Sequence, residues 1–382
     1  MTLCNDTKSH YAEGMLRVCH LTTVHPRNDI RIFLKESRAL ALVGFDVHLV
    51  VGDGEGDADI DGVQVHDIGV KPLSRIKRIL LQPKRALKKI LSLNPSIVHF
   101  HDPELLPVGV KLAKYGIHVI YDAHEDVPRQ ILMKCWIPRA IRFCVARVFE
   151  FYENRAVTKL SGVVAATSHI ERRFSELGLR TVNVNNYPMS EELAPVDGAL
   201  PPRLKRVCYI GGISKMRGAV QLVHALSLLP DVRLTLCGHF DGPDFAEELK
   251  KVPGWAQVDY FGHVDRETVR RVVAESIAGI VTFLPGPNHI DSQPNKLFEY
   301  MSAELPVIAS DFPLWRKIVD GAGCGLCVNP ESPTQIASAI RVLLDSPQKV
   351  KEMGRAGRLV VLEKYNWPVE AKKMVDFYKA LA

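Results

Sequence analysis

Residues 207–218 of the chain read VCYIGGISKMRG, and this stretch decides how the whole sequence is organised. The apolar run Val207–Ile210 is typical of a buried strand, and the glycines directly after it predict a tight turn into a helix. The stretch follows a segment from Tyr187 to Pro202 that is rich in proline and lacks periodicity. We therefore expect a second α/β domain to begin here, after a linker.

Short apolar and β-branched runs recur on both sides of this linker, with helical patterns between them. In the second half these predicted strands are Val207–Ile210, Val232–Cys237, Val258–Phe261, Ile280–Leu284 and Val307–Ser310. In the first half they are Leu16–Thr23, Asp46–Val51, Val63–Ile68, Ile97–Phe100, Val119–Tyr121, Val163–Ala166 and Val182–Val184. A first helix is predicted across Arg31–Val43, ended by Gly44. Strands that alternate with helices indicate βαβ units and parallel sheets.

The predicted fold is α/β, with two Rossmann-like, doubly wound parallel-sheet domains, because 382 residues exceed what one hydrophobic core usually supports. The expected division is an N-terminal domain at 1–190, a linker at 191–202, a second domain at 203–366 and a C-terminal helix at 367–382 that packs back across the junction. Two such domains would face a central cleft lined by the carboxyl ends of strands, where open α/β sheets bind ligands.

Composition excludes several classes of protein. With 47% hydrophobic and 24% charged residues the chain is globular, and a net charge of +6 is too small to indicate a nucleic-acid-binding protein. Eight cysteines are scattered, and the close pair Cys324 and Cys327 lacks the further ligands of a zinc site. Without a leader or an apolar run of the ~18 residues that a membrane span requires, we expect a cytoplasmic protein.

The glycine-rich turn after Ile210 is a candidate phosphate-binding loop. Gly211 and Gly212 allow close approach of the backbone, and Lys215 and Arg217 add positive charge beside it. The spacing fits neither a Walker loop nor a dinucleotide fingerprint. The alternative reading is an ordinary strand-to-helix turn with two solvated cations.

A second constellation is the stretch DSQPNKLFEYM at residues 291–301. Pro294 is expected at the first helical position, which leaves the amides of Asn295, Lys296 and Leu297 unpaired and directed at an anion. Glu299 lies more than one turn further on and is suited to accept hydrogen bonds from the hydroxyls of a ribose. The alternative for Glu299 is a surface carboxylate, but apolar neighbours flank it, so it needs a partner.

Together these stretches resemble the donor-site signature of the retaining glycosyltransferase family 4, whose members have the two-domain GT-B fold. Two acidic residues separated by seven others mark that family, and Asp291 and Glu299 occupy those positions. In the first half, the stretches HFHDPELL at 99–106 and YDAHED at 121–126 resemble motifs of a subset that acts in polysaccharide and cell-envelope assembly.

The resemblance implies roles for residues of the second domain. Glu299 would hold the ribose, while Arg217 and the amides of 295–297 would hold the diphosphate of the donor. Asp291 would bind hydroxyls of the donor sugar. Further residues at strand ends would border the base and the sugar, namely Gly238, Gly262, His263 and Val264.

In the first domain the resemblance implies that His124 lies beside the donor sugar and the incoming hydroxyl. Without that context His124 would more readily be read as a structural histidine. The residues expected to act in catalysis are therefore His124, Arg217, Asp291 and Glu299. The residues expected on the acceptor side are Arg27, Asp29, Asp102 and Asp126.

The sequence also departs from the family pattern. Gly212 stands where many members have Arg or Lys, so Lys215 would have to substitute for that cation. Asp291 stands where Glu is usual and is one methylene shorter. The first strand-to-helix loop, at 22–29, lacks the paired glycines common in the family, which leaves acceptor contacts there open.

The resemblance implies a nucleoside diphosphate sugar as donor, with UDP the first expectation and GDP the second, and no metal ion or other cofactor. The acidic stretch Asp57–Asp61 has a metal-binding spacing, but we read it as a solvated turn in a glycine-rich loop. The acceptor is expected to be a glycan or a lipid-linked glycan. Three other activities stay open: a sugar-nucleotide epimerase, a non-catalytic nucleotide-sugar sensor and, less favoured, a dehydrogenase.

Two basic amphipathic segments predict a peripheral contact with an anionic membrane surface. Residues 71–91 hold eight basic residues and no acidic one, interleaved with apolar residues, and residues 129–147 are similar. The alternative is two solvated helix faces that cover the sheet.

Overall fold

The computed structural model describes residues 15–134, 137–189, 193 and 202–381, and the side chains of residues 75 and 76 are not described. The predicted linker at 191–202 therefore lies, except for Leu193 and Pro202, outside the described residues. The chain forms two compact units. Unit 1 comprises Met1–Pro128, Pro138–Asn185 and Ala371–Ala382, and unit 2 comprises Arg129–Ile137 and Asn186–Glu370.

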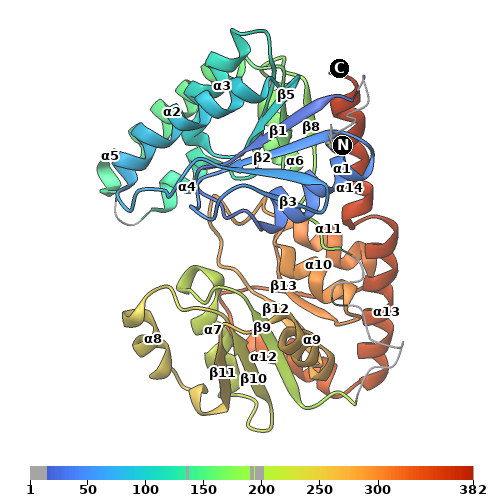
Figure 1. The fold of residues 1–382 in the computed structure, drawn as a ribbon. Coiled ribbons are helices and arrows are strands. Elements are labelled where there is room, and N and C mark those ends of the chain that lie inside the picture. Colours follow the sequence, from blue (N-terminus) through green and yellow to red (C-terminus); the bar gives the residue numbers. More distant parts are fainter. Residues whose placement is uncertain (1–14, 135–136, 190–192, 194–201, 382) are drawn as a thin grey trace, which may run out of the picture. The chain divides into compact units, whose positions relative to one another are not determined.

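Unit 1 contains an eight-stranded sheet with the order β3-β4-β2-β1-β5-β6-β7-β8 (Figure 1). Its strands are β1 Arg17–Leu21, β2 Asp46–Val51, β3 Ala58–Ile60, β4 Val63–Asp67, β5 Ile97–Phe100, β6 His118–Ala123, β7 Gly162–Ala165 and β8 Thr181–Asn183. All neighbouring strands are parallel except β3, which runs antiparallel to β4.

Helices cover both faces of this sheet. The elements are η1 Ile30–Ser37, α1 Arg38–Leu42, α2 Arg75–Leu93, η2 Pro103–Leu105, α3 Leu106–Ala113, α5 Arg139–Val157 and α6 Ser168–Ser175. Helix α4 (Val127–Met133) crosses from unit 1 into unit 2, and helix α14 (Trp367–Lys379) returns the chain to unit 1. Apolar residues of α2, α3, α5 and α6 form one core against the sheet, while η1 and α14 lie against the other face (Figure 1).

Unit 2 contains a six-stranded parallel sheet with the order β11-β10-β9-β12-β13-β14. Its strands are β9 Arg206–Ile210, β10 Arg233–Cys237, β11 Val258–Gly262, β12 Ala278–Val281, β13 Val307–Ser310 and β14 Gly325–Val328. Its helices are η4 Lys215–Arg217, α7 Ala219–Leu226, α8 Pro243–Lys250, η5 Trp255–Gln257, α9 Arg266–Glu275, α10 Asn295–Ser302, α11 Pro313–Ala322, α12 Pro333–Leu344 and α13 Pro347–Glu363. Two separate apolar cores cover its faces, one with α7 and α12 and the other with α9, α10 and α11. The predicted fold class, two doubly wound α/β domains, is confirmed.

Two edge strands, β3 and β14, were not predicted from the sequence. The stretch Asp57–Asp61, which we read as a solvated turn, contains β3, so that prediction is wrong. Its side chains are half-buried or exposed and largely acidic, which leaves no apolar signal for a strand. Strand β14 was also missed, because its glycine and half-buried residues resemble a loop.

The first helix of unit 1 begins with an uncommon turn. The prediction of a helix at 31–43 is right in place, but Ile30–Ser37 forms a π-helix and only Arg38–Leu42 is α-helical. In a π-helix the backbone amide donates to the carbonyl five residues earlier, as the Leu34 amide does to the Asp29 carbonyl (3.2 Å). Arg31 and Glu36 are five residues apart, and both side chains are buried against the sheet. This places a cation and a carboxylate side by side in unit 1.

Candidate functional site

The glycine turn after β9 adopts a backbone conformation that residues with side chains rarely adopt. Gly211 has φ +114°, and a Cβ placed on it would lie 3.3 Å from the Lys296 ammonium. A Cβ on Gly238, at the end of β10, would lie 2.0 Å from the Gly211 carbonyl oxygen. These glycines therefore bring two strand ends together and leave the backbone of the turn bare beside a cation.

Arg217 is held at this turn by its own loop. Its guanidinium donates to the Gly212 carbonyl (3.1 Å), and its amide is capped by the Ser214 hydroxyl (3.3 Å). The next residue, Gly218, has φ +75°, and its backbone approaches Thr282 so closely that a Cβ would lie 1.9 Å from the carbonyl oxygen. The guanidinium carbon of Arg217 lies 5.6 Å from the centre of the Phe283 ring.

Lys296 brings a second cation to the same place. Its side chain is buried, and among the described residues its ammonium has no hydrogen-bond partner. The nitrogen lies 3.7 Å from the centre of the Tyr209 ring and 5.2 Å from that of Phe283. Burial lowers the pKa of Lys296 well below its usual range, and the nearby charge of Arg217 lowers it further. A bound anion would relieve both penalties.

The start of α10 lies one residue later than the sequence predicts. Pro294 is the N-cap, and the helix begins at Asn295. The Leu297 amide donates to the Pro294 carbonyl (3.0 Å), so the prediction that three amides are unpaired is wrong for this one. The amides of Asn295 and Lys296 are the ones that stay candidates for a phosphate oxygen at this helix start.

Glu299 has a partner that the sequence analysis missed. Both terminal nitrogens of Arg266, at the start of α9, lie 3.3–3.4 Å from one oxygen of the Glu299 carboxylate. The Glu299 side chain is 20% exposed and the Arg266 side chain 43%. The carboxylate therefore stays accessible, and a ribose that binds it has to compete with Arg266.

Three further predicted residues of unit 2 lie closer to its surface. The Lys215 ammonium pairs with Glu248 on α8 (3.2 Å), and both side chains are largely exposed, so the structure shows no sign that Lys215 replaces the missing cation of the loop. Asp291 is exposed in the loop before α10, and Val264 is half-buried after β11. Next to Val264, the rings of His239 and His263 stack at 5.1 Å.

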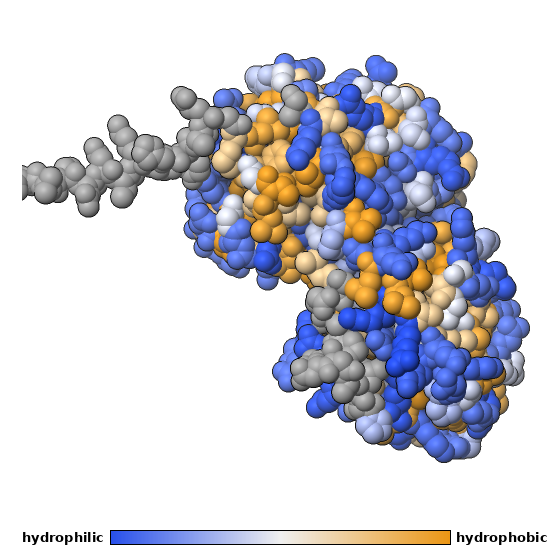
Figure 2. Space-filling view, turned by 90° about the vertical axis from the view of Figure 1, so that its right-hand side faces the viewer, coloured by the Kyte–Doolittle hydropathy of each residue, from blue (hydrophilic) through white to orange (hydrophobic). Residues whose placement is uncertain are grey.

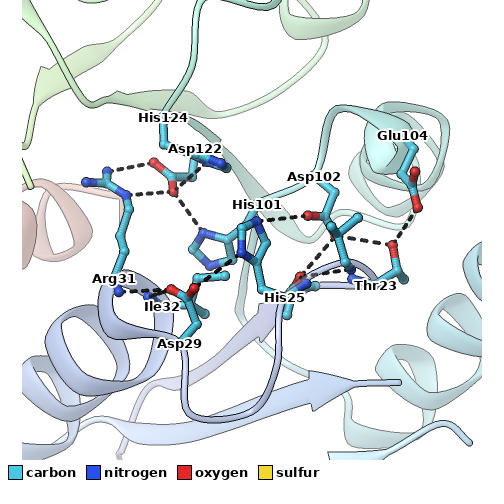
Figure 3. A network of polar contacts seen from close by, with 12 residues as sticks. Thr23, His25, Asp29, Arg31, Ile32, His101, Asp102, Glu104, Asp122 and His124 are labelled. Atoms are coloured by element: carbon cyan, nitrogen blue, oxygen red, sulfur yellow. Dashed lines mark hydrogen bonds and ion pairs between the residues drawn. The ribbon is translucent and has the colours of Figure 1, made fainter. Parts of the chain in front are cut away.

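In unit 1, Asp102 organises the first strand-to-helix loop (Figure 3). One oxygen of its buried carboxylate accepts hydrogen bonds from the Thr23 amide (2.5 Å), the Val24 amide (3.2 Å) and the hydroxyls of Thr22 and Thr23. The other oxygen lies 3.6 Å from His25. Burial raises the pKa of Asp102, against the effect of these hydrogen bonds. Its hydrogen bonds indicate that Asp102 fixes the shape of this loop.

The other predicted acceptor-side residues are also engaged within unit 1. Arg27 makes two hydrogen bonds of 2.7 Å to Asp53. The Asp29 carboxylate caps η1 by accepting from the Arg31 and Ile32 amides (both 2.9 Å). Asp126 lies 3.4 Å from Arg173 and 3.5 Å from His169.

His124 lies at the edge of a buried ionic network, with 21% of its side chain exposed (Figure 3). Its Nδ1 is 3.4 Å from Asp122, and Asp122 makes two hydrogen bonds to Arg31 (2.7 and 3.0 Å). Burial alone would lower the pKa of His124, but the Asp122 carboxylate outweighs it and raises the pKa. Asp122 itself stays ionised: burial opposes this, but Arg31 holds its pKa well below the usual range.

His25 is a second histidine, next to His124 in unit 1, that the sequence analysis did not identify as a candidate site residue. Its ring centre lies 5.5 Å from that of His124, and its Nδ1 lies 3.3 Å from Asp29. The hydrogen bond to Asp29 raises the pKa of His25. The loop at 22–29 therefore presents an imidazole next to His124, in place of the glycines common in the family.

Two family profiles match the chain in succession. One, described as "Glycosyl transferase 4-like domain", matches residues 31–187, and the other, "Glycosyl transferases group 1", matches residues 191–360. Together they cover most of both units.

Known proteins and structures are similar over different lengths. An alpha-maltose-1-phosphate synthase of Mycolicibacterium smegmatis is 27% identical over 46% of this chain and 48% of its own length, so the match spans about half of that relative. The structure of a sucrose-phosphate synthase from Thermosynechococcus elongatus has a TM-score of 0.77 at 18% identity, over 96% of this chain and 99% of its own. That of Anabaena HepE in complex with UDP and glucose has a TM-score of 0.73 at 13% identity, over 96% and 100%.

Proposed function

Since the chain belongs to the family 4 glycosyltransferases of GT-B fold, we propose that it transfers a hexosyl or N-acetylhexosaminyl group from a nucleoside diphosphate to an acceptor hydroxyl with retention of anomeric configuration. In the proposed reaction the residues around the Gly211 turn, called the half-site of unit 2, bind the nucleoside diphosphate. The residues around His124, called the half-site of unit 1, contact the sugar and the acceptor.

The observation that carries the proposal is the convergence of Arg217 and Lys296 on the Gly211 turn. Two cations lie near one aromatic ring, and one of them is buried without a hydrogen-bond partner among the described residues. A diphosphate supplies the two negative charges that this arrangement lacks. The bare backbone of Gly211 and the start of α10 add room and amide dipoles for the same group.

This arrangement suits the chemical step. When the bond between the sugar C1 and the diphosphate oxygen breaks, negative charge grows on the leaving group, and preorganised cations stabilise it. The acceptor oxygen forms the new bond to C1 from the same face, and its proton passes to the departing diphosphate oxygen, which retains configuration. Arg217 and Lys296 supply the positive charge, so the proposed transfer needs no metal ion at the diphosphate.

UDP is the proposed carrier, with GDP as the second choice. Support comes from the fold that the chain shares with Anabaena HepE, whose structure was determined with UDP and glucose. Glu299 is the proposed ligand of the ribose and Asp291 that of sugar hydroxyls. His124 is proposed to contact the sugar, since Asp122 orients its ring and leaves part of it exposed.

The proposed acceptor is a glycan or lipid-linked glycan at an anionic membrane surface, and helix α5 supports this. Its exposed apolar side chains Ile141, Val145, Val148 and Tyr152 follow helical spacing and share one face, while the exposed Phe143 and Phe151 lie on other sides of the helix. Basic residues lie along the same helix at 139, 142, 147 and 155, and Arg147 pairs with Glu150 (3.1 Å). Among the described residues, no helix is both long and apolar enough to cross a bilayer.

The membrane-facing segment differs from the one that the sequence predicts at 129–147. Residues 129–137 belong to unit 2 and residues 138–147 to unit 1, Ile137 is buried, and Trp136 lies outside the described residues. In the segment 71–91 two of the cations pair with carboxylates, Arg78 with Glu104 and Lys89 with Asp57. Exposed apolar side chains also occur elsewhere, as the orange patches on both units in Figure 2 show. A test of α5 therefore needs a matched apolar control.

Binding to anionic vesicles at low salt tests this part of the proposal. Ile141→Ser combined with Val148→Ser should lower the bound fraction several-fold, whereas Leu42→Ser, at an exposed apolar position of α1, should not. Equal loss in both variants, or no binding by the wild type, would contradict it.

Transfer itself is tested by incubating the protein with UDP-hexoses, UDP-N-acetylhexosamines and GDP-mannose, together with glycan and lipid extracts as acceptors. We expect release of one nucleoside diphosphate per sugar transferred, and loss of this release in Arg217→Met. Conversion of the donor without release of the diphosphate would instead indicate an epimerase. Binding without turnover would indicate a sensor.

A further inference from the structure

Four metal-ligating side chains meet inside unit 1, on the sheet face that η1 and α14 cover. His20 of β1 is in register with His99 of β5, and His101 follows His99 by two residues, so the three imidazoles share one face. Glu36 of the π-helix η1 points at them. All four side chains have 0% exposure.

The distances place the Glu36 carboxylate at the centre of this His20–Glu36–His99–His101 cluster. Its Oε2 lies 4.0 Å from His20 Nδ1, 3.7 Å from His99 Nδ1 and 3.9 Å from His101 Nδ1. One ligand atom from each residue can be chosen such that all four lie within 4.8 Å of one another. Four ligands at 2.0–2.1 Å from a tetrahedral ion are separated by about 3.3 Å, so small shifts would complete such a site.

Several polar atoms of the cluster lack hydrogen bonds within the described part of the chain. These atoms are both carboxylate oxygens of Glu36, His20 Nε2 and His99 Nε2. Glu36 Oε1 lies near Arg31 (3.0 Å), but Oε2 lies among the imidazoles at distances too long for hydrogen bonds. Buried polar atoms are nearly always satisfied, so Glu36 Oε2 calls for an occupant, either an ion or a water molecule. Two of the Nδ1 atoms that face it already have partners, His20 Nδ1 in His101 Nε2 (2.9 Å) and His99 Nδ1 in the Tyr378 hydroxyl (2.6 Å), so a bound ion would replace these two hydrogen bonds.

The partners outside the cluster favour an ion. Two buried carboxylates, those of Glu36 and Asp122, share the buried guanidinium of Arg31. Asp122 accepts a hydrogen bond from His101 Nδ1 (2.9 Å), which leaves the lone pair of His101 Nε2 toward His20. A carboxylate behind a ligating histidine is the usual outer partner in metal sites.

We propose that His20, Glu36, His99 and His101 bind one divalent transition-metal ion of the zinc type. Three imidazoles and one carboxylate are a ligand set for Zn²⁺, Fe²⁺ or Co²⁺. The ion joins β1, β5 and η1 inside unit 1, and its role is to stabilise that unit. The site shares no residue with the diphosphate half-site of unit 2, so its presence does not depend on the proposed transfer.

The test is metal analysis of the protein as purified, followed by titration of the chelator-treated protein with Zn²⁺ and Co²⁺. We expect about one ion per chain. We also expect visible absorption of four-coordinate Co²⁺ and a thermal midpoint that falls on chelation and recovers with Zn²⁺. Binding should weaken in Glu36→Gln and His99→Asn by more than the ~10- to 100-fold that loss of an outer partner costs.

A matched control is His48→Gln, because His48 pairs with His66 (2.8 Å) in the same sheet but outside the cluster, and binding should be unchanged there. If wild-type protein holds no stoichiometric metal and shows no Co²⁺ absorption, the occupant is a water molecule and the proposal is wrong. This outcome does not require any variant to fold, and it leaves donor binding untouched as a separate measurement.

Discussion

The ammonium of Lys296 and the guanidinium of Arg217 lie 5.2 and 5.6 Å from the centre of the same Phe283 ring. Lys296 comes from α10 and Arg217 from η4, so tertiary structure, rather than sequence proximity, brings the two cations together. The charge of Arg217 disfavours a charged Lys296, the more so because Lys296 is buried. The protein keeps this unfavourable arrangement, and a dianionic ligand is the simplest reason for it.

The first prediction concerns proton uptake by Lys296. Its pKa lies well below the usual range in the ligand-free protein, because of burial and then of Arg217. A bound diphosphate favours the charged ammonium and raises the pKa, so binding takes up a proton, and affinity falls as pH rises between the two pKa values.

Calorimetry of UDP binding in buffers with different ionisation enthalpies measures this uptake. Lys296→Met should abolish the uptake that is specific to this group. A binding enthalpy that is independent of the buffer in the wild type at every pH would show that Lys296 does not titrate on binding.

The second prediction is that Lys296 lowers the stability of the ligand-free protein while it strengthens UDP binding. Lys296→Met removes a buried amino group that has no hydrogen-bond partner among the described residues and keeps an unbranched apolar side chain, so the thermal midpoint of the ligand-free protein should rise. The same variant should lose the stabilisation that UDP gives the wild type. A lowered midpoint without ligand would mean that the ammonium already has a stabilising partner.

The third prediction separates Glu299 from Arg266. Glu299→Ala should weaken UDP binding by about 10- to 100-fold, equivalent to about 1.5–3 kcal/mol for hydrogen bonds to a charged group. Arg266→Ala frees the carboxylate and should leave binding equal or slightly tighter, since the pair is exposed.

The exposed pair of Arg316 and Asp311 provides a comparison for these variants, and Arg316→Ala should not change binding. Strong loss of UDP affinity in Arg266→Ala would assign the donor contact to the arginine instead.

The fourth prediction concerns the cap of the π-helix. Burial would raise the pKa of Asp29, but hydrogen bonds from His25 and from the Ile32 amide lower it to about 2. Its contribution to stability is therefore fully present above its unfolded pKa near 3.8 and is lost as pH falls toward 2. Asp29→Ala should cost about 1 kcal/mol at neutral pH.

Asp29→Asn serves as the control, because asparagine keeps a capping oxygen without the charge. Thermal unfolding at pH 7 and at pH 3 should show that the gap between wild type and Asp29→Ala narrows in acid. A gap that is unchanged or wider at pH 3 would contradict the assignment.

The fold was predictable because its buried strands carry an apolar signal. Gly211, at the end of β9, follows such a run directly, so the turn beside the half-site of unit 2 was predictable as well. The edge strand β3 was not, because Asp57 and its neighbours contribute no apolar pattern. The predicted start of helix α10 was off by one residue, because proline is found both at the N-cap and at the first helical position.

Candidate site residues that belong to one sequence motif were predictable. Residues that the fold brings together from distant parts of the chain were not. Arg266 reaches Glu299 from a different helix, 33 residues away in the chain. Asp122 lies in strand β6 and Arg31 in the π-helix η1, so no spacing in the sequence indicates that the two side chains pair. Lys215 was wrongly expected at the phosphate loop because it is close to Arg217 in sequence. Its ammonium pairs instead with Glu248, a contact that only the tertiary structure reveals.

A crystal structure of the protein with UDP shows whether a diphosphate binds between the cation of η4 and that of α10. We expect phosphate oxygens within hydrogen-bond distance of both Arg217 and the Lys296 ammonium, with the ribose at Glu299. A bound UDP whose phosphates contact neither cation would contradict it.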